Sequence, residues 1–447
     1  MGDSLVERLG QGQAEDLLTH PVHRWAIGKL VELVRELRQC GSPEDAYHFQ
    51  QRLLDLLLQV EQDRGAVSRA RKMLRKKPGK IPNHAPELRS GLDPLDLYSW
   101  ELEYEVFERV CRQLRTVGDG LAWRMFGYER NIIFALSRSD PAGPMFDKKG
   151  LEREREIIAE AWRDNGEFVL HHDSTSALRI GDLSIFGKDG GVLLREIKTN
   201  DRYRDKAQDQ KILDTVNALI NGGPLAAGGY TLVPSNVAYR ANMKGLREIL
   251  ILAHKRGIQG AQLPGRRAIV AVNFSSAPDH FSPHQFNARF AAETKRQQRR
   301  AAIRSEHHII ALNSVDRAAR SPAEPPWAIY PIEPELAVGL ITDVIFYTVC
   351  MAPETLLDAL AKVGVQGRWL QQLNGTENPA KPLLQVSMRT GNKLSYTSMN
   401  VIELARLLIE LVDLPTWCQH LSVLLQADLP AGTRPWTYFA GENNVWC

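Results

Sequence analysis

The chain contains 447 residues, of which 43% are hydrophobic and 24% are charged, and its formal net charge is +3. These values are typical of a globular protein with two or three domains and sizeable cores. The small net charge excludes overall charge as a source of affinity for nucleic acid, so any such affinity has to come from local basic patches.

The five cysteines are scattered and show no CxxC spacing. This pattern argues against a zinc site or a disulfide framework and favours a reducing compartment. Residues 1–4 do not begin a basic region followed by an apolar run, so we expect no signal peptide. The most apolar long window, 336–351, is shorter than about 18 residues and contains Asp343, so we predict a buried helix there and no membrane span. We therefore predict a cytoplasmic protein.

Apolar residues at helical spacing predict helices over residues 5–63, with a break at Gly41 and a new start capped by Ser42. Residues 64–80 carry many basic residues and no acidic one. A run of this kind is usually a solvated face or tail, and contact with nucleic acid is the alternative. Three prolines follow, and we predict a linker over 78–95.

A second helical segment is predicted over 95–114. The residues after it are less regular in pattern, because Gly118 and Gly120 act as punctuation. We therefore divide this part of the chain into a helical N-terminal region, 1–80, and a helical connector, 81–147.

The segment 148–221 is predicted to have the order helix, strand, strand, strand, helix. A charged helix covers 148–165 and ends at Gly166 as its C-cap, and a strand covers 167–172. A hairpin follows, and the last helix covers 204–221.

The hairpin has predicted strands over 180–186 and 192–199, joined by a turn with an Asp-Gly step. Alternation along the second strand places two apolar and two charged residues on one face, namely Val192, Leu194, Glu196 and Lys198. We expect this face to meet the core, because its first two residues are apolar. The alternative is a solvent-facing strand on which Glu196 and Lys198 form an ion pair.

Acidic side chains gather around this hairpin in the predicted arrangement. Glu154 falls on the apolar stripe of the preceding helix, where an acid needs a partner. The carboxylates of Glu154, Asp182 and Glu196 can thus converge at one end of a small sheet, beside the amine of Lys198. Clustered carboxylates need a cation, and their oxygen atoms suit Mg²⁺ or Mn²⁺. Such an ion can activate water and stabilise a phosphodiester under attack, while a lysine orients the water.

The pattern of Asp182 in one hairpin strand and Glu196-Ile197-Lys198 in the next resembles the PD-(D/E)XK nuclease superfamily, which has the restriction-endonuclease-like fold. The resemblance implies that Asp182 and Glu196 are metal ligands and that the Ile197 carbonyl is a further ligand. It implies that Lys198 is the catalytic lysine and that Glu154 is the helix acid some members carry. Such proteins often act in restriction or anti-phage defence systems.

The chain departs from the family pattern at two positions. Gly181 stands where many members have proline, which is a common departure. Some members have a tyrosine four residues after a glutamine in the following helix, but here Gln210 is followed at that spacing by Asp214. Gln210 or Gln208 is therefore only a weak candidate for a contact in the site. A buried strand at 268–274 is a candidate for a further core strand.

His171, His172 and Asp173 directly precede the hairpin. Such residues can bind a metal ion, but exposed loop histidines are commoner, and we favour an exposed loop.

A strongly basic helix is predicted over 283–304, with Arg289, Lys295, Arg296, Arg299, Arg300 and Arg304 against one acid. We assign residues 148–320 to the nuclease-like core and 321–447 to a mixed α/β C-terminal domain. The predicted fold class is α/β, with a restriction-endonuclease-like core in which helices flank a mixed sheet, plus the helical N-terminal region.

These observations predict a Mg²⁺- or Mn²⁺-dependent nuclease that hydrolyses phosphodiester bonds in nucleic acid, in DNA rather than RNA. The basic strips 64–80 and 289–304 are the expected contacts with nucleic acid, although each alone is equally well a solvated face. We expect no membrane contact, and both a homo-oligomer and a partner protein stay open. The alternative is a non-catalytic nucleic-acid-binding or scaffold protein that retains the fold with a degenerate site.

Overall fold

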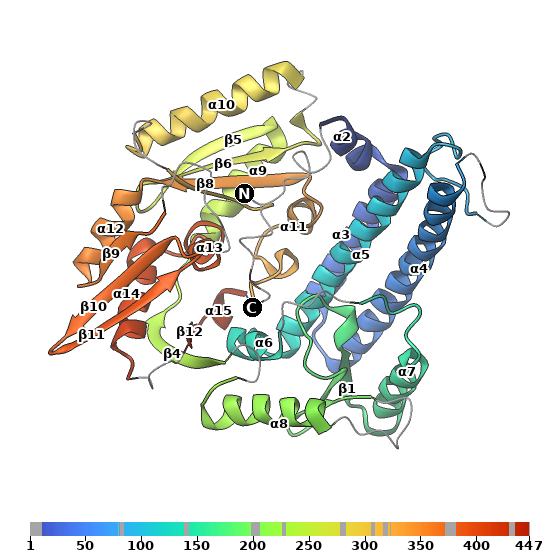
Figure 1. The fold of residues 1–447 in the computed structure, drawn as a ribbon, viewed down its shortest axis with the longest axis horizontal. Helices are drawn as coiled ribbons and strands as arrows, with labels where there is room; N and C mark the ends of the chain where they lie inside the picture. Colours follow the sequence, from blue (N-terminus) through green and yellow to red (C-terminus); the bar gives the residue numbers. More distant parts are fainter. Residues whose placement is uncertain are drawn as a thin grey trace.

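The computed structural model describes residues 11–78, 80, 85–137, 143–197, 206–225, 229–277, 283–304, 309–315, 321, 323–371, 381–428 and 434–446. They form a mixed α/β structure with several small sheets. Long helices occupy one side of the molecule and a four-stranded sheet with its helices occupies the other (Figure 1). None of the described helices combines the length and the apolar character that crossing a membrane requires.

The helical side is built on two long helices that pack along each other, α4 and α5. Ser42 caps the start of α4, as predicted. Its hydroxyl accepts from the Asp45 N–H, and the Asp45 carboxylate accepts from the Ser42 N–H, which is a capping box. Because α4 continues to Lys76, most of the basic run 64–80 is helical. The helices here are α2 (Gln11–Thr19), α3 (Pro21–Gln39), α4 (Pro43–Lys76), α5 (Leu97–Met125) and α6 (Arg130–Leu136).

The helix α5 extends beyond its predicted end, so the interpretation of its two glycines as punctuation is wrong. A Cβ atom on Gly118 would lie 2.0 Å from the carbonyl oxygen of Ser174, and one on Gly120 would lie 2.7 Å from a methyl carbon of Leu37. Both glycines therefore let other segments approach the helix closely.

A small antiparallel sheet in the order β1-β2-β3 lies at one end of α4 (Figure 1). The predicted order of helix, three strands and helix is observed, and Gly166 ends the first helical stretch with a φ of 63°. A small apolar cluster of Ile157, Ile158, Val169 and Leu183 joins α7 to the sheet. The elements are α7 (Leu151–Glu160), the π-helical turn η1 (Ala161–Asn165), β1 (Phe168–His171), the 3₁₀ turn η2 (His172–Ser174), β2 (Leu183–Phe186), β3 (Val192–Arg195) and α8 (Lys206–Asn221).

The other side contains a four-stranded antiparallel sheet in the order β5-β6-β8-β7, a three-stranded meander β9-β10-β11 and the parallel pair β4-β12. The helices are α9 (Met243–Arg256), α10 (Pro283–Arg300), α11 (Pro334–Ile341), α12 (Pro353–Lys362), α13 (Val401–Leu408), α14 (Leu414–Gln426) and α15 (Asn443–Trp446), with a 3₁₀ turn η5 (Trp327–Ile329). The strands are β4 (Tyr230–Ala238), β5 (Ile258–Leu263), β6 (Arg267–Asn273), β7 (Ile310–Asn313), β8 (Ile345–Met351), β9 (Gln366–Trp369), β10 (Leu384–Thr390), β11 (Lys393–Met399) and β12 (Arg434–Ala440).

Two expectations for this side are wrong. The apolar window 336–351 forms the end of α11 and then the strand β8, because Asp343 reverses the chain at a φ of 59° and the following residues are mostly β-branched or aromatic. The predicted strand at 268–274 exists as β6, but it pairs with β5 and β8 and belongs to a different sheet from β1–β3.

The two sides share one apolar core and a buried ion cluster. Arg130 of α6 binds both carboxylate oxygens of Glu410, at 2.9 and 2.6 Å, and its Nε lies 2.5 Å from Glu442. Each of the three side chains is at most 4% exposed. Because an unpaired buried charge is costly, this cluster ties α6 to the C-terminal part of the chain.

We predict that Gly118→Ala destabilises the protein by about 2 kcal/mol or more, because the new methyl group overlaps the Ser174 carbonyl group and η2 must move away. Chemical denaturation monitored by circular dichroism measures this change. The matched control is Gly28→Ala on α3, where no atom lies within 4 Å of the new Cβ. Since alanine favours a helix, the control should gain about 0.5–1 kcal/mol. Equal stabilisation by both substitutions would contradict the packing argument.

Candidate active site

The hairpin of β2 and β3 is the element that presents the predicted site. Its turn is closed by a hydrogen bond from the Gly187 N–H to the Gly191 carbonyl at 2.9 Å, and Gly190 has a φ of 82°. The turn is therefore confirmed as an Asp-Gly turn, and it fixes the register of the two strands. The strands are shorter than predicted. Regular pairing starts at Leu183 on β2 and ends at Arg195 on β3, which is the residue paired with Leu183.

Asp182 lies directly before β2 and is held on both sides. Its backbone N–H donates to the Arg195 carbonyl at 2.9 Å, and its carbonyl accepts from the His172 N–H at 2.9 Å. One carboxylate oxygen accepts from the Ile197 N–H at 2.7 Å. Continuing the register by one step places Asp182 opposite Glu196, so these two acids are neighbours across the hairpin.

The amine of Lys148 lies among three carboxylates. Its Nζ is 2.8 Å from Glu154 Oε1, 2.8 Å from Asp173 Oδ2 and 3.1 Å from Asp182 Oδ1. We call these four residues the Lys148 cluster. The acids come from α7, from the η2 turn after β1 and from the residue before β2, so the cluster joins three segments at one end of the small sheet.

His171 extends this cluster from the end of β1. Its Nε2 lies 2.8 Å from Glu154 Oε2, and both side chains are fully buried. Glu154, Asp173 and His171 also offer ligand atoms that all lie within 4.8 Å of one another, a spacing suitable for a metal ion. Glu154 therefore faces the sheet, as its place on the helical stripe predicts.

Charge pairing shifts the pKa values of the cluster. Burial opposes the charge of Lys148, but the Asp173 carboxylate and the two other acids outweigh it and raise the pKa of the amine. Burial by itself would raise the pKa of Glu154, yet hydrogen bonds from His171 and Lys148 lower it below its usual value. The pKa of Asp173 is lowered because Lys148 outweighs the effect of its burial. These shifts favour the charged forms of Lys148, Glu154 and Asp173.

His172 holds the strand on both sides of Asp182. Its Nδ1 lies 2.9 Å from the Gly181 carbonyl, which can only accept, so Nδ1 donates and Nε2 accepts from the Ser184 hydroxyl at 2.7 Å. Burial lowers the pKa of His172 to about 3. The ring is therefore neutral in the folded protein, and its two hydrogen bonds fix the start of β2.

Side chains of α4 hold the strand β1 at its outer edge. The Gln50 amide donates to the Val169 carbonyl at 2.7 Å and accepts from the His171 N–H at 3.0 Å, so it takes the place of a neighbouring strand. Glu61 accepts from the N–H groups of Met145 and Phe146, at 2.7 and 3.0 Å. These contacts fix the backbone close to both His171 and Lys148.

Side chains of α5 hold the residues after β1. Arg115 pairs with Glu61 at 2.6 Å and donates to the Asp173 carbonyl at 3.1 Å. Asp119 accepts from the N–H groups of Ser176 and Ala177, at 2.7 and 2.9 Å. The backbone on both sides of the cluster is therefore anchored to the helical side of the molecule.

The described residues place only some of the sequence-predicted site residues together. Glu154 and Asp182 both belong to the Lys148 cluster, Glu196 is half-buried beside Asp182, and Ile197 binds Asp182 through its N–H. Lys198 lies outside the described residues. Gln210 is exposed on α8 and donates to Asp214 of the same helix at 2.8 Å.

Two expectations about the site need correction. Of the face predicted to meet the core, Val192 is 44% exposed, whereas Leu194 is half-buried and packs against the main core. The prediction is therefore wrong at Val192 and confirmed at Leu194. The expected exposed loop at His171 and His172 is also wrong, since both rings are buried.

The sequence analysis missed Lys148 as a member of the site, and it considered His171 and Asp173 as metal ligands but favoured an exposed loop. Lys148 was part of a predicted charged helix, but it precedes α7 and its amine turns into the cluster. The signal that favours these two residues is their position at and just after the end of β1, because this end lies beside the start of β2, next to Asp182.

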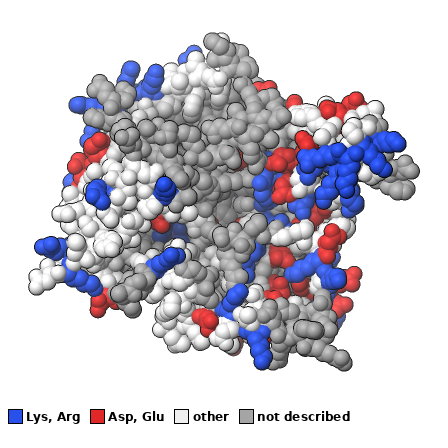
Figure 2. Space-filling model, viewed as in Figure 1, with Lys and Arg blue, Asp and Glu red and all other residues white. Residues whose placement is uncertain are grey.

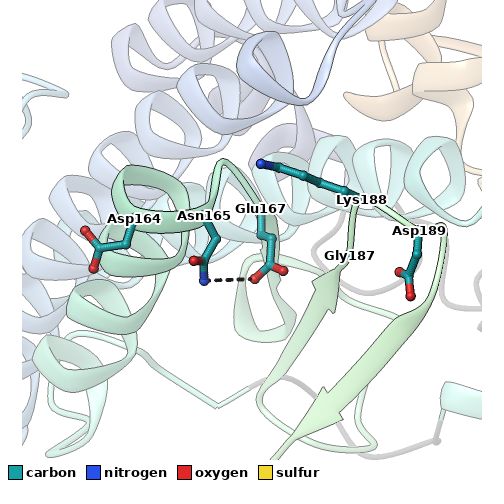
Figure 3. A pocket seen from close by; sticks show the side chains of 6 residues that line it. All are labelled: Asp164, Asn165, Glu167, Gly187, Lys188 and Asp189. Carbon is teal, nitrogen blue, oxygen red and sulfur yellow. Dashed lines mark hydrogen bonds between the residues drawn. The ribbon is translucent and has the colours of Figure 1, made fainter.

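A surface hollow of about 510 Å³ lies beside the hairpin turn (Figure 3). Asp182 lies at the opposite end of β2, so this hollow is separate from the Lys148 cluster. Its lining residues are Asp164, Asn165, Glu167, Gly187, Lys188 and Asp189.

Comparisons with protein families, with curated proteins and with solved structures found no match to this chain. The interpretation of the site therefore depends on its own residues and their geometry.

We predict that the free energy of unfolding falls as the pH drops from 6.5 towards 3, in part because of His172. The unfolded chain binds a proton at this histidine near pH 6.5, whereas the folded protein does so only at about pH 3, so protonation favours unfolding between these values. The substitution His172→Gln should reduce the slope by about 1.4 kcal/mol per pH unit. Urea denaturation at several pH values measures it.

The matched control for this prediction is His48→Gln, which removes an exposed histidine of α4. The control should keep the slope of the wild-type protein. An unchanged slope in the His172 variant would show that the buried ring does not stay neutral.

Proposed function

We propose that this protein is a metal-dependent nuclease that hydrolyses phosphodiester bonds in nucleic acid, with DNA preferred to RNA. The observation that carries the proposal is the convergence of Glu154 and Asp182 around a single cation, with Glu196 adjacent to Asp182 in the hairpin. A helix acid and two hairpin acids at one end of a small sheet are the arrangement that the resemblance to PD-(D/E)XK nucleases implies.

The donor atoms suit Mg²⁺ or Mn²⁺. Three carboxylate oxygens lie 2.8–3.1 Å from one positively charged nitrogen, so the site already accommodates a cation. Glu154 Oε1 is buried and lies 2.8 Å from the Lys148 amine, so an ion that binds this oxygen would take the place of that amine. Asp182, Glu196, Glu154 and the Ile197 carbonyl are the proposed ligands. A bound divalent ion would supply positive charge to stabilise a phosphodiester under attack.

The chain's own residues have defined tasks in this proposal. His171 keeps Glu154 ionised and oriented, and His172 fixes the backbone around Asp182. Lys198 follows Ile197 directly and is proposed to orient the attacking water and to stabilise the developing negative charge.

One observation favours a second candidate function, a non-catalytic nucleic-acid-binding or scaffold protein. Lys148 neutralises part of the charge of the carboxylates without a metal ion, as a structural ion pair does. The presence of Asp182, Glu196 and Lys198 in one chain favours catalysis.

The basic strips are the proposed contacts with nucleic acid. Figure 2 shows Lys and Arg gathered at the upper right, where α4 ends. Within the run 64–80, three arginines contact α5, namely Arg64, Arg71 and Arg75. Lys72, Lys76 and Lys77 are exposed and available to phosphates. The second strip lies on α10, which packs on β5 and β6 at the opposite end of the molecule from β1 (Figure 1).

We predict that the purified protein cleaves plasmid or single-stranded DNA with Mg²⁺ or Mn²⁺ and does not cleave after chelation. Asp182→Asn, Glu154→Gln and Lys198→Ala should each reduce the cleavage rate about 100-fold or more, because each removes a charge required in the transition state. Gel assays on DNA and RNA, with melting curves for each variant, measure this.

The control variant is Glu152→Gln, which removes an exposed acid from the same helix. It should leave cleavage unchanged. Cleavage that survives in both Asp182→Asn and Lys198→Ala would reject the site, and salt-sensitive binding without any cleavage would favour the second candidate.

We predict that a variant with Lys72, Lys76 and Lys77 changed to glutamine binds DNA more weakly. The slope of the logarithm of the binding constant against the logarithm of salt concentration should fall by up to about 2.7, since each phosphate contact contributes about 0.9. Fluorescence anisotropy at several salt concentrations measures both quantities.

A parallel variant with Lys295, Arg299 and Arg300 changed to glutamine tests the α10 strip, where all three residues are exposed. A strip whose neutralisation leaves the salt slope unchanged does not contact the nucleic acid.

A further inference from the structure

The position of Lys148 has a consequence for the binding of a metal ion. We propose that the Lys148 amine is an internal cation that competes with a divalent metal ion for the same carboxylates. Metal binding would then require the lysine side chain to leave the cluster. The inference rests on the proposed function for the role of the metal, whereas the competition itself is a property of binding.

The geometry supports competition for one position. The Nζ atom contacts Glu154, Asp173 and Asp182 at 2.8–3.1 Å, and the three acids come from different segments. An ammonium group has three N–H donors, so three carboxylates can accept one hydrogen bond each from it. A metal ion that binds the same oxygens needs shorter distances, of about 2.0–2.1 Å for Mg²⁺. The ion and the amine therefore cannot share the centre of the cluster.

The charges favour the same conclusion. Three carboxylates and one ammonium leave the cluster with an excess of negative charge, which attracts a divalent ion. Two cations at this short separation would repel each other strongly, because the site is partly screened from water. The amine leaves as the metal ion enters.

Lys148 can leave without unfolding the site. Its side chain is 30% exposed, so a path to solvent is open. Its backbone is fixed separately, since its N–H donates to the Met145 carbonyl at 2.9 Å and its carbonyl accepts from the Leu151 N–H at 3.1 Å. Rotation about the side-chain bonds is therefore sufficient.

Two of the three acids, Glu154 and Asp182, keep a second contact when the lysine leaves. His171 holds one oxygen of Glu154 at 2.8 Å, and the Ile197 N–H holds one oxygen of Asp182 at 2.7 Å. The remaining oxygen of each carboxylate is the one that faces Lys148. These free oxygens are the ones offered to the metal ion, so Lys148 lowers the affinity for metal while it holds the site in shape.

Binding of Mn²⁺ to the full-length protein, measured by isothermal titration calorimetry, tests the competition. The variant Lys148→Met keeps the length of the side chain and removes its charge, and it should bind Mn²⁺ about 10-fold or more tightly than the wild-type protein. The control Lys149→Met changes the exposed neighbouring lysine and should bind as the wild-type protein does. Equal or weaker binding by Lys148→Met, or no binding by it, would overturn the proposal.

A second measurement needs no variant and covers the case in which Lys148→Met does not fold. An amine-reactive ester labels exposed lysines of the wild-type protein, and mass spectrometry of peptides gives the rate at each position. Labelling of Lys148 should rise several-fold in saturating Mn²⁺, whereas that of Lys149 should not change. An unchanged rate at Lys148 would overturn the proposal. If Lys148 and Mn²⁺ compete but the protein cleaves no nucleic acid, the proposed function is rejected and the competition stands.

Discussion

The ion cluster around Lys148 is the interaction on which the arrangement of the candidate site depends. Three carboxylates that come from α7, from the turn after β1 and from the start of β2 would repel one another without a cation between them. Apolar contacts hold the small sheet on both sides, because Val169 and Leu183 pack with α7 while Phe168 and Leu170 belong to the main core. These contacts do not neutralise the carboxylates at its end, whereas the shared ammonium group does. The same arrangement gathers acidic oxygen atoms where a nuclease of the proposed kind needs them.

The long helices supply the rest of the support. Gln50 satisfies the outer edge of β1, Arg115 binds the Asp173 carbonyl, and Gly118 allows η2 to lie against α5. These are polar contacts to backbone groups, and a buried backbone group without a partner is costly. Changes in α4 or α5 would therefore be transmitted to the carboxylates through the backbone. This gives the helical side a structural role in the site, in addition to its exposed lysines at the end of α4.

Local sequence patterns predicted the parts of the site that local physics determines. The Asp-Gly step specified the hairpin turn, and helical periodicity placed Glu154 towards the sheet. The missed parts depend on contacts between residues far apart in the chain. Nothing near Gln50 or Gly118 in the sequence indicates that β1 or Ser174 will approach them. The exposure of Val192 was also beyond local reasoning, because alternation shows which residues share a face and does not show whether that face is covered.

The separation of the acidic site from the basic end of α4 has a physical consequence for the proposed function. Phosphates are repelled by the uncompensated carboxylates of the cluster, so binding energy for nucleic acid has to come from elsewhere on the surface. Glu61 fixes the backbone near Lys148, and Lys76 follows it on the same helix. At 1.5 Å per residue these two positions are about 22 Å apart, the length of about six base pairs. A nucleic acid bound at the exposed lysines of α4 therefore reaches the site only if it extends over roughly that length. Very short oligonucleotides would then lack one of the two contacts, even when the carboxylates are fully competent.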